Sequence, residues 1–219
     1  MDNLTCRELI KAEKVTKRFG NLVAVDNVNF VLYENEMAGI VGSNGAGKTT
    51  FFNVLTGYFF PDDGKVFYEN QDVTRISPQK RVGMGMMRTF QLTSTFDNLK
   101  VVDNMSLSFF RAHRTSSTFR LLTNTLAAFR GEERIWKCLE DFDLASVANR
   151  EVKHLSLGEK RRLEIAMAVL AEPKVLLLDE PLAGLSESEI SGLLGILQSH
   201  AHKQTILLVE HKISKVQDI

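Results

Sequence analysis

Short apolar runs alternate with amphipathic segments along this chain. Residues 37–41, 175–178 and 205–209 are mostly or entirely apolar and have the length of strands that are buried on both faces. Residues 186–198 have the apolar periodicity of a helix. The same i, i+3, i+4, i+7 spacing predicts another helix, through Leu163, Ala166, Met167 and Leu170. Strands that alternate with helices predict an α/β fold whose core strands run parallel.

The N-terminal part of the chain contains further strand patterns. Residues 15–19 and 28–32 are rich in β-branched and apolar side chains, and they predict two strands with a polar turn near Asn21. A proline- and glycine-containing turn precedes a short predicted strand at 65–68. Residues 83–90 predict a buried strand.

The middle of the chain, residues 97–155, has a different character. Residues 101–110 and 132–142 predict helices, and the polar, basic residues 113–117 predict a loop between them. The segment 121–129 is compatible with a helix that has one apolar face or with a mobile connection. The absence of proline from this whole stretch favours helices.

Composition limits the class of protein. The 219 residues are 44% apolar and 25% charged, with a net charge of zero and a sequence pI of about 7.0. These values predict one domain with a substantial core, and the lack of basic excess argues against a nucleic-acid binder. Cys6 and Cys138 lack metal-site spacing and suit a reducing compartment. No apolar run reaches the about 20 residues of a membrane span, and the N-terminus lacks a signal pattern, so we expect membrane association to be peripheral.

Residues 42–49 read Gly-Ser-Asn-Gly-Ala-Gly-Lys-Thr and match the phosphate-binding pattern G-x-x-x-x-G-K-[ST]. The predicted strand 37–41 precedes them and a predicted helix start at 50–55 follows, which is the context that gives the pattern physical meaning. Glycines let backbone amides surround phosphate oxygens, Lys48 adds a positive charge, and Thr49 offers a hydroxyl to Mg²⁺. The sequence therefore predicts a nucleoside triphosphate site.

Asp179 and Glu180 directly follow the apolar run at 175–178. An aspartate at the end of a buried strand next to a phosphate loop is the usual partner of Mg²⁺ in such proteins. Glu180 is then placed to orient or deprotonate an attacking water molecule. Two solvated acids before Pro181 are the alternative, and the upstream phosphate loop makes that alternative the weaker one.

The sequence Ser156-Leu157-Gly158-Glu159 has two interpretations. Ser-x-x-Glu before an apolar helix is a capping box, which explains the serine and the glutamate. It does not explain Gly158, because glycine is a poor helix former and is used where another group, such as a phosphate, approaches closely. Local sequence leaves both interpretations open.

Three further residues carry little information alone. A histidine after a buried strand, His211, is more often a structural residue than a ligand. Gln91 is equally unspecific, and Phe19 is more often a core residue than a platform for a base. Their value depends on the motifs around them.

Taken together, seven motifs in this order resemble the ATP-binding subunit family of ABC transporters, over about residues 12–215. They are the aromatic Phe19, the phosphate loop with Thr50, Gln91 of the Q-loop, the signature motif at 155–159, Walker B with its glutamate at 176–180, the D-loop at 183–186 and the switch histidine His211. Within this family the chain is most similar to the ATPases of branched-chain amino-acid importers. That similarity lies in Arg-Thr-Phe-Gln at 88–91, the run that starts at Gly158, and Ala-Gly-Leu at 183–185.

The resemblance implies an α/β fold with a P-loop NTPase (RecA-like) core, a small antiparallel β subdomain and an inserted helical subdomain. It implies one ABC ATPase domain over residues 1–219, with the nucleotide-binding core and β subdomain at 1–91 and 156–219 and the helical subdomain at 92–155. The helical subdomain would dock on membrane subunits, and Gln91 would link that docking surface to the nucleotide.

The resemblance also implies roles for single residues. The implied catalytic residues are Glu180, which would polarise the lytic water, His211, which would contact the γ-phosphate, and Gln91. The implied Mg²⁺ ligands are Thr49, Gln91 and Asp179. The implied ATP-binding residues are Phe19, Val25, Gly42, Ser43, Asn44, Gly45, Ala46, Gly47, Lys48, Thr49, Thr50, Ser156 and Gly158. Of these, Ser156 and Gly158 would bind ATP that is held by a second subunit.

The chain departs from the family's commonest pattern at three places. The signature motif has Leu157 and Glu159 where glycine and glutamine are commonest, which bears on affinity for the second subunit's ATP. The D-loop ends in Ser186 and lacks the usual acid. The sequence stops eight residues after His211, so we expect the C-terminal helices usual in this family to be largely absent.

The implied function is ATP hydrolysis that energises a membrane transporter, an importer of branched-chain amino acids or similar small polar solutes. The implied partners are a second ABC ATPase subunit in a homo- or heterodimer, integral membrane permease subunits and an extracytoplasmic solute-binding protein. Nucleic acid is not expected as a partner. The expected location is the cytoplasmic face of the inner or plasma membrane.

The alternative function is that of a non-transport ABC ATPase that acts on nucleic acid or ribosomes. A nucleotide-binding regulator without turnover is a third hypothesis.

Overall fold

The computed structural model describes residues 7–89, 95–112 and 129–211. These residues fall into two compact units. The core unit comprises residues 1–88, 174–182 and 197–219, and the helical unit comprises residues 89–173 and 183–196. The domain limits that the sequence suggested, at 91/92 and 155/156, remain a prediction.

An antiparallel sheet with the strand order β2-β1-β4-β5 forms one part of the core unit. The strands are β1 (Glu8–Phe19), β2 (Leu22–Tyr33), β4 (Asp63–Tyr68) and β5 (Gln71–Asp72). The first two strands are longer than the predicted segments 15–19 and 28–32. Lys14 and Asn27 explain the difference, because they lie at register shifts with φ values of 49° and 48° and interrupt the apolar alternation without ending the strands.

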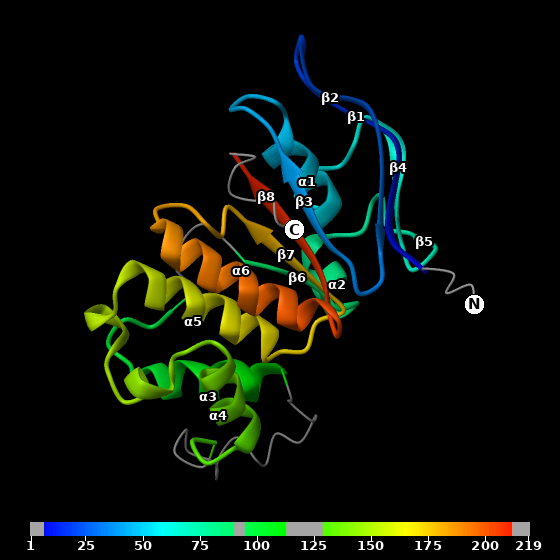
Figure 1. Ribbon diagram of the computed structural model, residues 1–219. Coiled ribbons are helices and arrows are strands. Elements are labelled where there is room, and N and C mark those ends of the chain that lie inside the picture. Colours follow the sequence, from blue (N-terminus) through cyan, green and yellow to red (C-terminus); the bar gives the residue numbers. More distant parts are fainter. Residues whose placement is uncertain (1–6, 90–94, 113–128, 212–219) are drawn as a thin grey trace, which may run out of the picture. The chain divides into compact units, whose positions relative to one another are not determined.

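A parallel sheet with the order β3-β8-β7-β6 forms the other part of the core unit (Figure 1). Its strands are β3 (Met37–Val41), β8 (Thr205–Glu210), β7 (Val175–Asp179) and β6 (Met86–Arg88). Every residue of β7 and β8 is buried, as their apolar sequences predict. The register pairs Val41 with Glu210 and Asp179 with Val209, so the carboxyl ends of three strands meet at one edge.

Two helices accompany these sheets. Helix α1 (Lys48–Thr56) follows β3, and the short helix α2 (Pro78–Gly83) precedes β6. Residues 83–85 were predicted as strand, and that prediction is wrong. Pro78 at the first turn starts a helix that extends through Gly83, and Gly85, with a φ of 97°, provides the reversal before β6.

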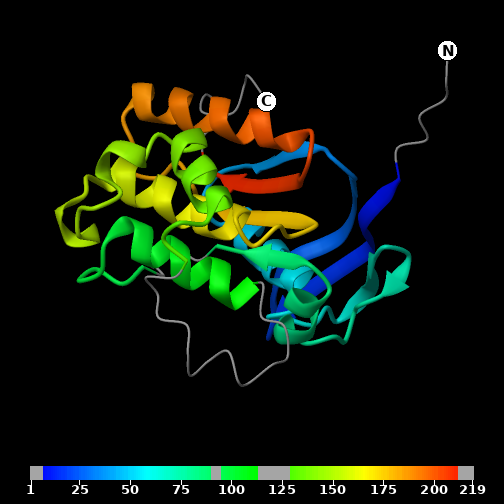
Figure 2. The same cartoon turned by 90° about the horizontal axis from the view of Figure 1, so that it is seen from below.

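The helical unit contains α3 (Val101–Ala112), α4 (Glu133–Asp141), α5 (Leu157–Val169) and most of α6 (Glu187–Ala201). The helices α3 and α5, green and yellow in Figure 2, lie side by side. Two short 3₁₀ helices, η3 (Ala145–Val147) and η4 (Val152–His154), connect α4 to α5. The predicted loop at 113–117 and nearly all of the segment 121–129 lie outside the described residues. Among the residues that are described, no helix is both long and apolar enough to cross a membrane.

Candidate functional site

The phosphate loop joins β3 to α1 and depends on glycine. Gly45 and Gly47 have φ values of 81° and 84°, a region that other residues rarely adopt. A Cβ atom on Gly47 would lie 2.1 Å from the carbonyl oxygen of Ala24 and 3.6 Å from the Cγ2 atom of the buried Val25. Only glycine therefore fits at position 47, and the loop backbone lies against β2.

Lys48 is the first residue of α1, and its side chain is bound inside the loop. Its Nζ atom donates to the carbonyl oxygens of Gly42 at 2.7 Å and Ser43 at 2.9 Å. The same atom lies 3.2 Å from Nδ1 of His211, the residue that follows β8. Lys48 is 6% exposed, so its charge is held at the carboxyl edge of the parallel sheet.

His211 connects Lys48 to Glu180. Its Nε2 atom lies 2.5 Å from Oε1 of Glu180. A charged lysine can only donate, so Nδ1 of His211 accepts and Nε2 carries the proton that is donated to Glu180. The contacts thus select one neutral tautomer of His211 and form a chain from the lysine to the glutamate.

The backbone at Glu180 is unusual for a residue with a side chain. Its φ is 49°, in the left-handed region, and its amide donates to the carbonyl oxygen of Val209 at 3.0 Å. Such a conformation costs of order 1 kcal/mol and persists where the surrounding structure imposes it. It directs the chain away from β7 immediately after Asp179 and places the Glu180 carboxylate at His211.

Asp179 is the last residue of β7 and is 3% exposed. Its Oδ2 atom accepts from Nη2 of Arg88 at 2.6 Å. Its Oδ1 atom is buried and has no hydrogen-bond partner within residues 7–89, 95–112 and 129–211. A buried carboxylate oxygen without a partner is costly in a protein interior and is a ligand that Mg²⁺ prefers, so the residues present fit that ion.

Phe19 ends β1 and is 43% exposed. Its ring packs edge-on against Phe59 with ring centroids 5.4 Å apart, and Nζ of Lys17 lies 5.6 Å from its centroid. The ring is thus held by neighbours and still offers accessible surface. This arrangement suits a planar ligand that stacks on the ring.

In the helical unit, the capping box at the start of α5 is present. Ser156 Oγ accepts from the amide of Glu159 at 3.2 Å, and Glu159 Oε2 accepts from the amide of Ser156 at 2.7 Å. The group that approaches Gly158 is a side chain: a Cβ atom there would lie 2.2 Å from Oε1 of Glu189. The capping box is therefore confirmed, Gly158 has a packing reason of its own, and its phosphate role remains a prediction.

Leu157, one of the departures from the family pattern, lies next to the D-loop. Leu157 is 54% exposed. A Cβ atom on Gly184 of the D-loop, which has a φ of 76°, would lie 2.9 Å from Cδ2 of Leu157. The left-handed backbone at position 184 is what favours glycine there, and the end of the Leu157 side chain lies beside it.

The structure brings Lys48, Glu180 and His211 together. Gln91 lies outside the described residues, and its role stays a prediction. Arg88 was not named as a site residue, although it contacts Asp179. The available signal is its place in the Arg-Thr-Phe-Gln block, on which the similarity to the importer ATPases partly rests.

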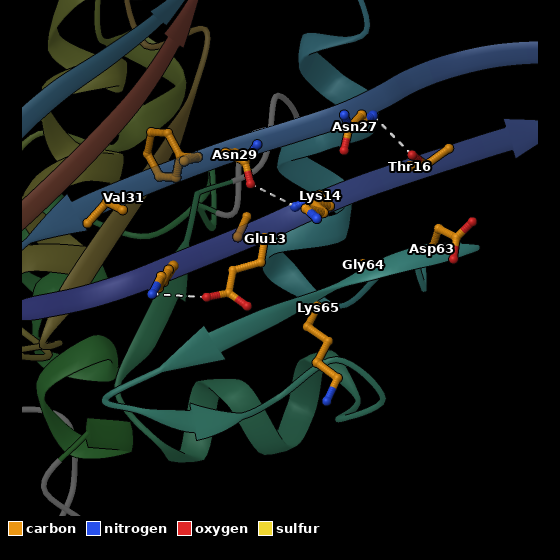
Figure 3. Close-up of a pocket in the computed structure, with 12 residues that line it drawn as sticks. Glu13, Lys14, Thr16, Asn27, Asn29, Val31, Asp63, Gly64 and Lys65 are labelled. Carbon is orange, nitrogen blue, oxygen red and sulfur yellow. Dashed lines mark hydrogen bonds and ion pairs between the residues drawn. The ribbon is translucent and has the colours of Figure 1, made fainter.

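A separate cavity of about 750 Å³ lies on the antiparallel sheet. Residues from β1, β2 and β4 line it, among them Glu13, Lys14 and Lys65 (Figure 3). None of the predicted site residues lines it, and its charges are mixed in sign. The cavity therefore does not belong to the phosphate site.

Comparisons with known proteins agree with this geometry. Residues 25–183 match the family model described as ABC transporter. The chain is 37% identical to the high-affinity branched-chain amino acid transport ATP-binding protein LivG of Escherichia coli (strain K12), over 96% of this chain and 85% of that protein. It is 36% identical to the corresponding protein BraF of Pseudomonas aeruginosa, over 97% of this chain and 86% of that protein.

Solved structures are similar as well. An ATP-binding cassette of an ABC transporter in its ADP conformation gives a TM-score of 0.79 at 28% identity, over 95% of this chain and 83% of that one. A nucleotide-free ATP-binding cassette from an ABC transporter gives 0.78 at 27% identity, over 96% and 84%. The fold class and the family expected from the sequence are thus confirmed. The chain belongs to the ABC transporter family, as one of its ATP-hydrolysing subunits.

Proposed function

We propose that this protein hydrolyses ATP with Mg²⁺ to energise an importer of branched-chain amino acids. The main evidence for the ATP site is a row of three hydrogen-bonded side chains, Lys48, His211 and Glu180, next to the buried carboxylate of Asp179. The proposed substrate class is supported by the named functions of the LivG and BraF relatives.

The loop and α1 hold the phosphates of ATP in this proposal. Backbone amides of the loop from Gly42 to Gly47 and the N-terminus of α1 present partial positive charge to phosphate oxygens. The ammonium of Lys48 exchanges its bonds to Gly42 and Ser43 for phosphate oxygens of higher negative charge. Phe19 stacks on the adenine ring.

Thr49, Asp179 and Gln91 would hold Mg²⁺. The ion, when bound, neutralises charge that develops on the transferred phosphoryl group. The hydroxyl of Thr49 and the Oδ1 atom of Asp179 are ligands of the kind this ion prefers.

Glu180 accepts a proton from, or orients, the water molecule that attacks the γ-phosphorus. His211 fixes the glutamate through its Nε2 proton and lies next to Lys48 on its other side. When ATP engages Lys48, the histidine loses one of the two partners that now fix it. The contact that Nδ1 of His211 makes with Lys48 would therefore depend on whether the γ-phosphate is present.

A second ATPase subunit completes each site. Ser156 Oγ accepts the bond from Glu159, and its hydroxyl would donate its own proton to a phosphate oxygen across the interface. Membrane permease subunits and an extracytoplasmic solute-binding protein are the further proposed partners. The proposed location is peripheral, on the cytoplasmic face of the membrane.

The test is reconstitution of the protein with its permease subunits and solute-binding protein in vesicles. Leucine, isoleucine or valine should stimulate phosphate release and accumulate in the lumen, whereas histidine should do neither. Stimulation by ribosomes or RNA in place of these amino acids would contradict the proposal.

A further inference from the structure

Arg88, the last residue of β6, joins two elements of the phosphate site in the core unit. Its Nη2 atom donates to Oδ2 of Asp179 at 2.6 Å, at the end of β7. Its Nη1 atom donates to Oδ1 of Asn53 at 2.6 Å and to Oγ1 of Thr56 at 3.2 Å, both on α1. One planar guanidinium thus binds the strand that carries the acid and the helix that follows the phosphate loop.

Two aromatic rings also pack against the guanidinium of Arg88. Its carbon lies 4.8 Å from the ring centroid of Phe52 and 5.3 Å from that of Tyr58. The side chain of Arg88 is 11% exposed and that of Asp179 is 4% exposed. A planar fork that is stacked and bound at several points has little freedom to move, which a lysine would not reproduce.

The helix face that Arg88 binds is the face that carries Thr49. Residues at i, i+4 and i+7 of a helix lie on one side, and Thr49, Asn53 and Thr56 have this spacing within α1. Arg88 therefore links the face that presents the Thr49 hydroxyl to the carboxylate of Asp179. These two residues are the Mg²⁺ ligands proposed above, on which this inference rests.

We propose that Arg88 is a positioning residue that sets the separation and orientation of Thr49 and Asp179 for Mg²⁺. Its bond to Oδ2 of Asp179 orients the carboxylate and leaves Oδ1 for the ion. A buried ion pair contributes little net stability, because desolvation opposes the attraction between the charges. The arrangement is explained by the orientation that it imposes on the metal ligands.

The test measures Mg²⁺ dependence of nucleotide binding, so it does not rely on turnover. A fluorescent ribose-labelled ATP analogue is titrated in EDTA and then with increasing MgCl₂, on Glu180→Gln protein. Arg88→Met should leave binding in EDTA within about twofold and raise the half-maximal Mg²⁺ concentration about tenfold to a hundredfold, as loss of partners behind metal ligands does. Asn53→Ala keeps the ion pair between Arg88 and Asp179 and should raise the half-maximal Mg²⁺ concentration less than Arg88→Met does.

Arg88→Lys decides the outcome if Arg88→Met fails to fold. It restores a charge beside Asp179 but cannot bind α1 at the same time, so thermal stability should recover while the Mg²⁺ requirement stays raised. Arg134→Met, which removes an exposed arginine paired with Glu172 at 3.3 Å, is the matched control and should change neither value.

Tighter Mg²⁺ binding in Arg88→Met would overturn the proposal, because it would show that the positive charge repels the ion more than the side chain orders its ligands. Unchanged Mg²⁺ dependence in folded Arg88→Met and Asn53→Ala would overturn it too. Asp179→Asn separates the two claims: if this variant also keeps the parent's Mg²⁺ dependence, the proposed metal site itself is wrong.

Discussion

The Glu189 carboxylate occupies the space next to Gly158 that a side chain at position 158 would need, since a Cβ atom there would lie 2.2 Å from Oε1 of Glu189. Glu189 is held in this place by Ser186, whose amide and hydroxyl donate to Oε2 at 2.9 and 2.7 Å. These bonds also lower the pKa of Glu189 below its usual value. The glycine of the signature motif therefore has a packing role inside the helical unit.

Gly158→Ala should lower the free energy of unfolding by about 1 kcal/mol or more, because the new methyl group must displace a bound carboxylate. Glu189→Ala combined with Gly158→Ala should recover most of the stability lost by the glycine change, since the clash is gone. Urea unfolding of the single and double variants measures this. Recovery of ATPase activity in the double variant would show that Gly158 serves packing only, whereas persistent loss supports the proposed phosphate contact.

The two roles of Ser156, helix cap and phosphate donor, can be separated by matched substitutions. Ser156→Asp keeps an N-cap acceptor for Glu159, so its melting temperature should stay close to that of the parent, whereas Ser156→Ala should lose about 1 kcal/mol. Both variants lack the hydroxyl donor, and ATP hydrolysis by the reconstituted transporter should fall in both. An active Ser156→Asp variant would show that capping is the whole role of this residue.

Arg81 is 1% exposed and its guanidinium donates to backbone carbonyls, including those of Val54 and Leu55 in the last turn of α1. Burial lowers its pKa to about 10. Arg81→Met should cost about 3 kcal/mol or more, because several buried carbonyl oxygens lose their donors. The exposed Arg134→Met should cost less than about 1 kcal/mol. A loss of equal size in both variants, measured by urea unfolding, would refute this role.

Two buried groups, the thiol of Cys138 and the phenol of Tyr68, make the free energy of unfolding depend on pH in the alkaline range. Burial raises the pKa of Cys138 from 9.0 to about 12 and also raises that of Tyr68, whose hydroxyl donates to the carbonyl of Met84. The folded state keeps these protons after the unfolded state has lost them, so stability is full below about pH 9 and falls as the pH rises from there. The free energy of unfolding should fall by up to about 1.4 kcal/mol per pH unit for each group.

Cys138→Ala and Tyr68→Phe remove one titrating group each. Each variant should show a shallower loss of stability between pH 9 and pH 10.5 than the parent, whatever its stability at pH 8. Urea unfolding at the three pH values measures the slopes. Slopes equal to that of the parent in both variants would mean that other groups govern the alkaline transition.

The parallel core is predictable from the sequence because its signals are local. The runs 175–178 in β7 and 205–209 in β8 are almost entirely apolar, and all of their residues are buried. In α5 and at its C-cap, Leu163, Ala166 and Leu170 of the predicted face are buried, but Met167 is only half-buried. The capping box at Ser156 was also readable, since its two residues are three apart and both bonds formed.

The parts that were missed depend on partners far away in the chain. Arg88 binds residues 32 to 91 positions away, and its place in the Arg-Thr-Phe-Gln block does not indicate which partners these are. The approach of Glu189 to Gly158 likewise requires the packing of α6 against the start of α5. The short helix α2 was overlooked because the apolar run beyond it reads as a strand, although Pro78 marks its start.

In the proposed mechanism Glu180, fixed by His211 in a site with Lys48 and Asp179, drives hydrolysis of bound ATP. The most direct test of this role is phosphate release by the Glu180→Gln variant, reconstituted with the membrane partners, together with the amount of ATP that the variant retains. We expect a rate at least about a hundredfold below that of the parent and ATP that stays bound, because glutamine keeps the shape of glutamate and cannot accept the proton. Phosphate release at the parent's rate would show that Glu180 is not the residue that drives hydrolysis.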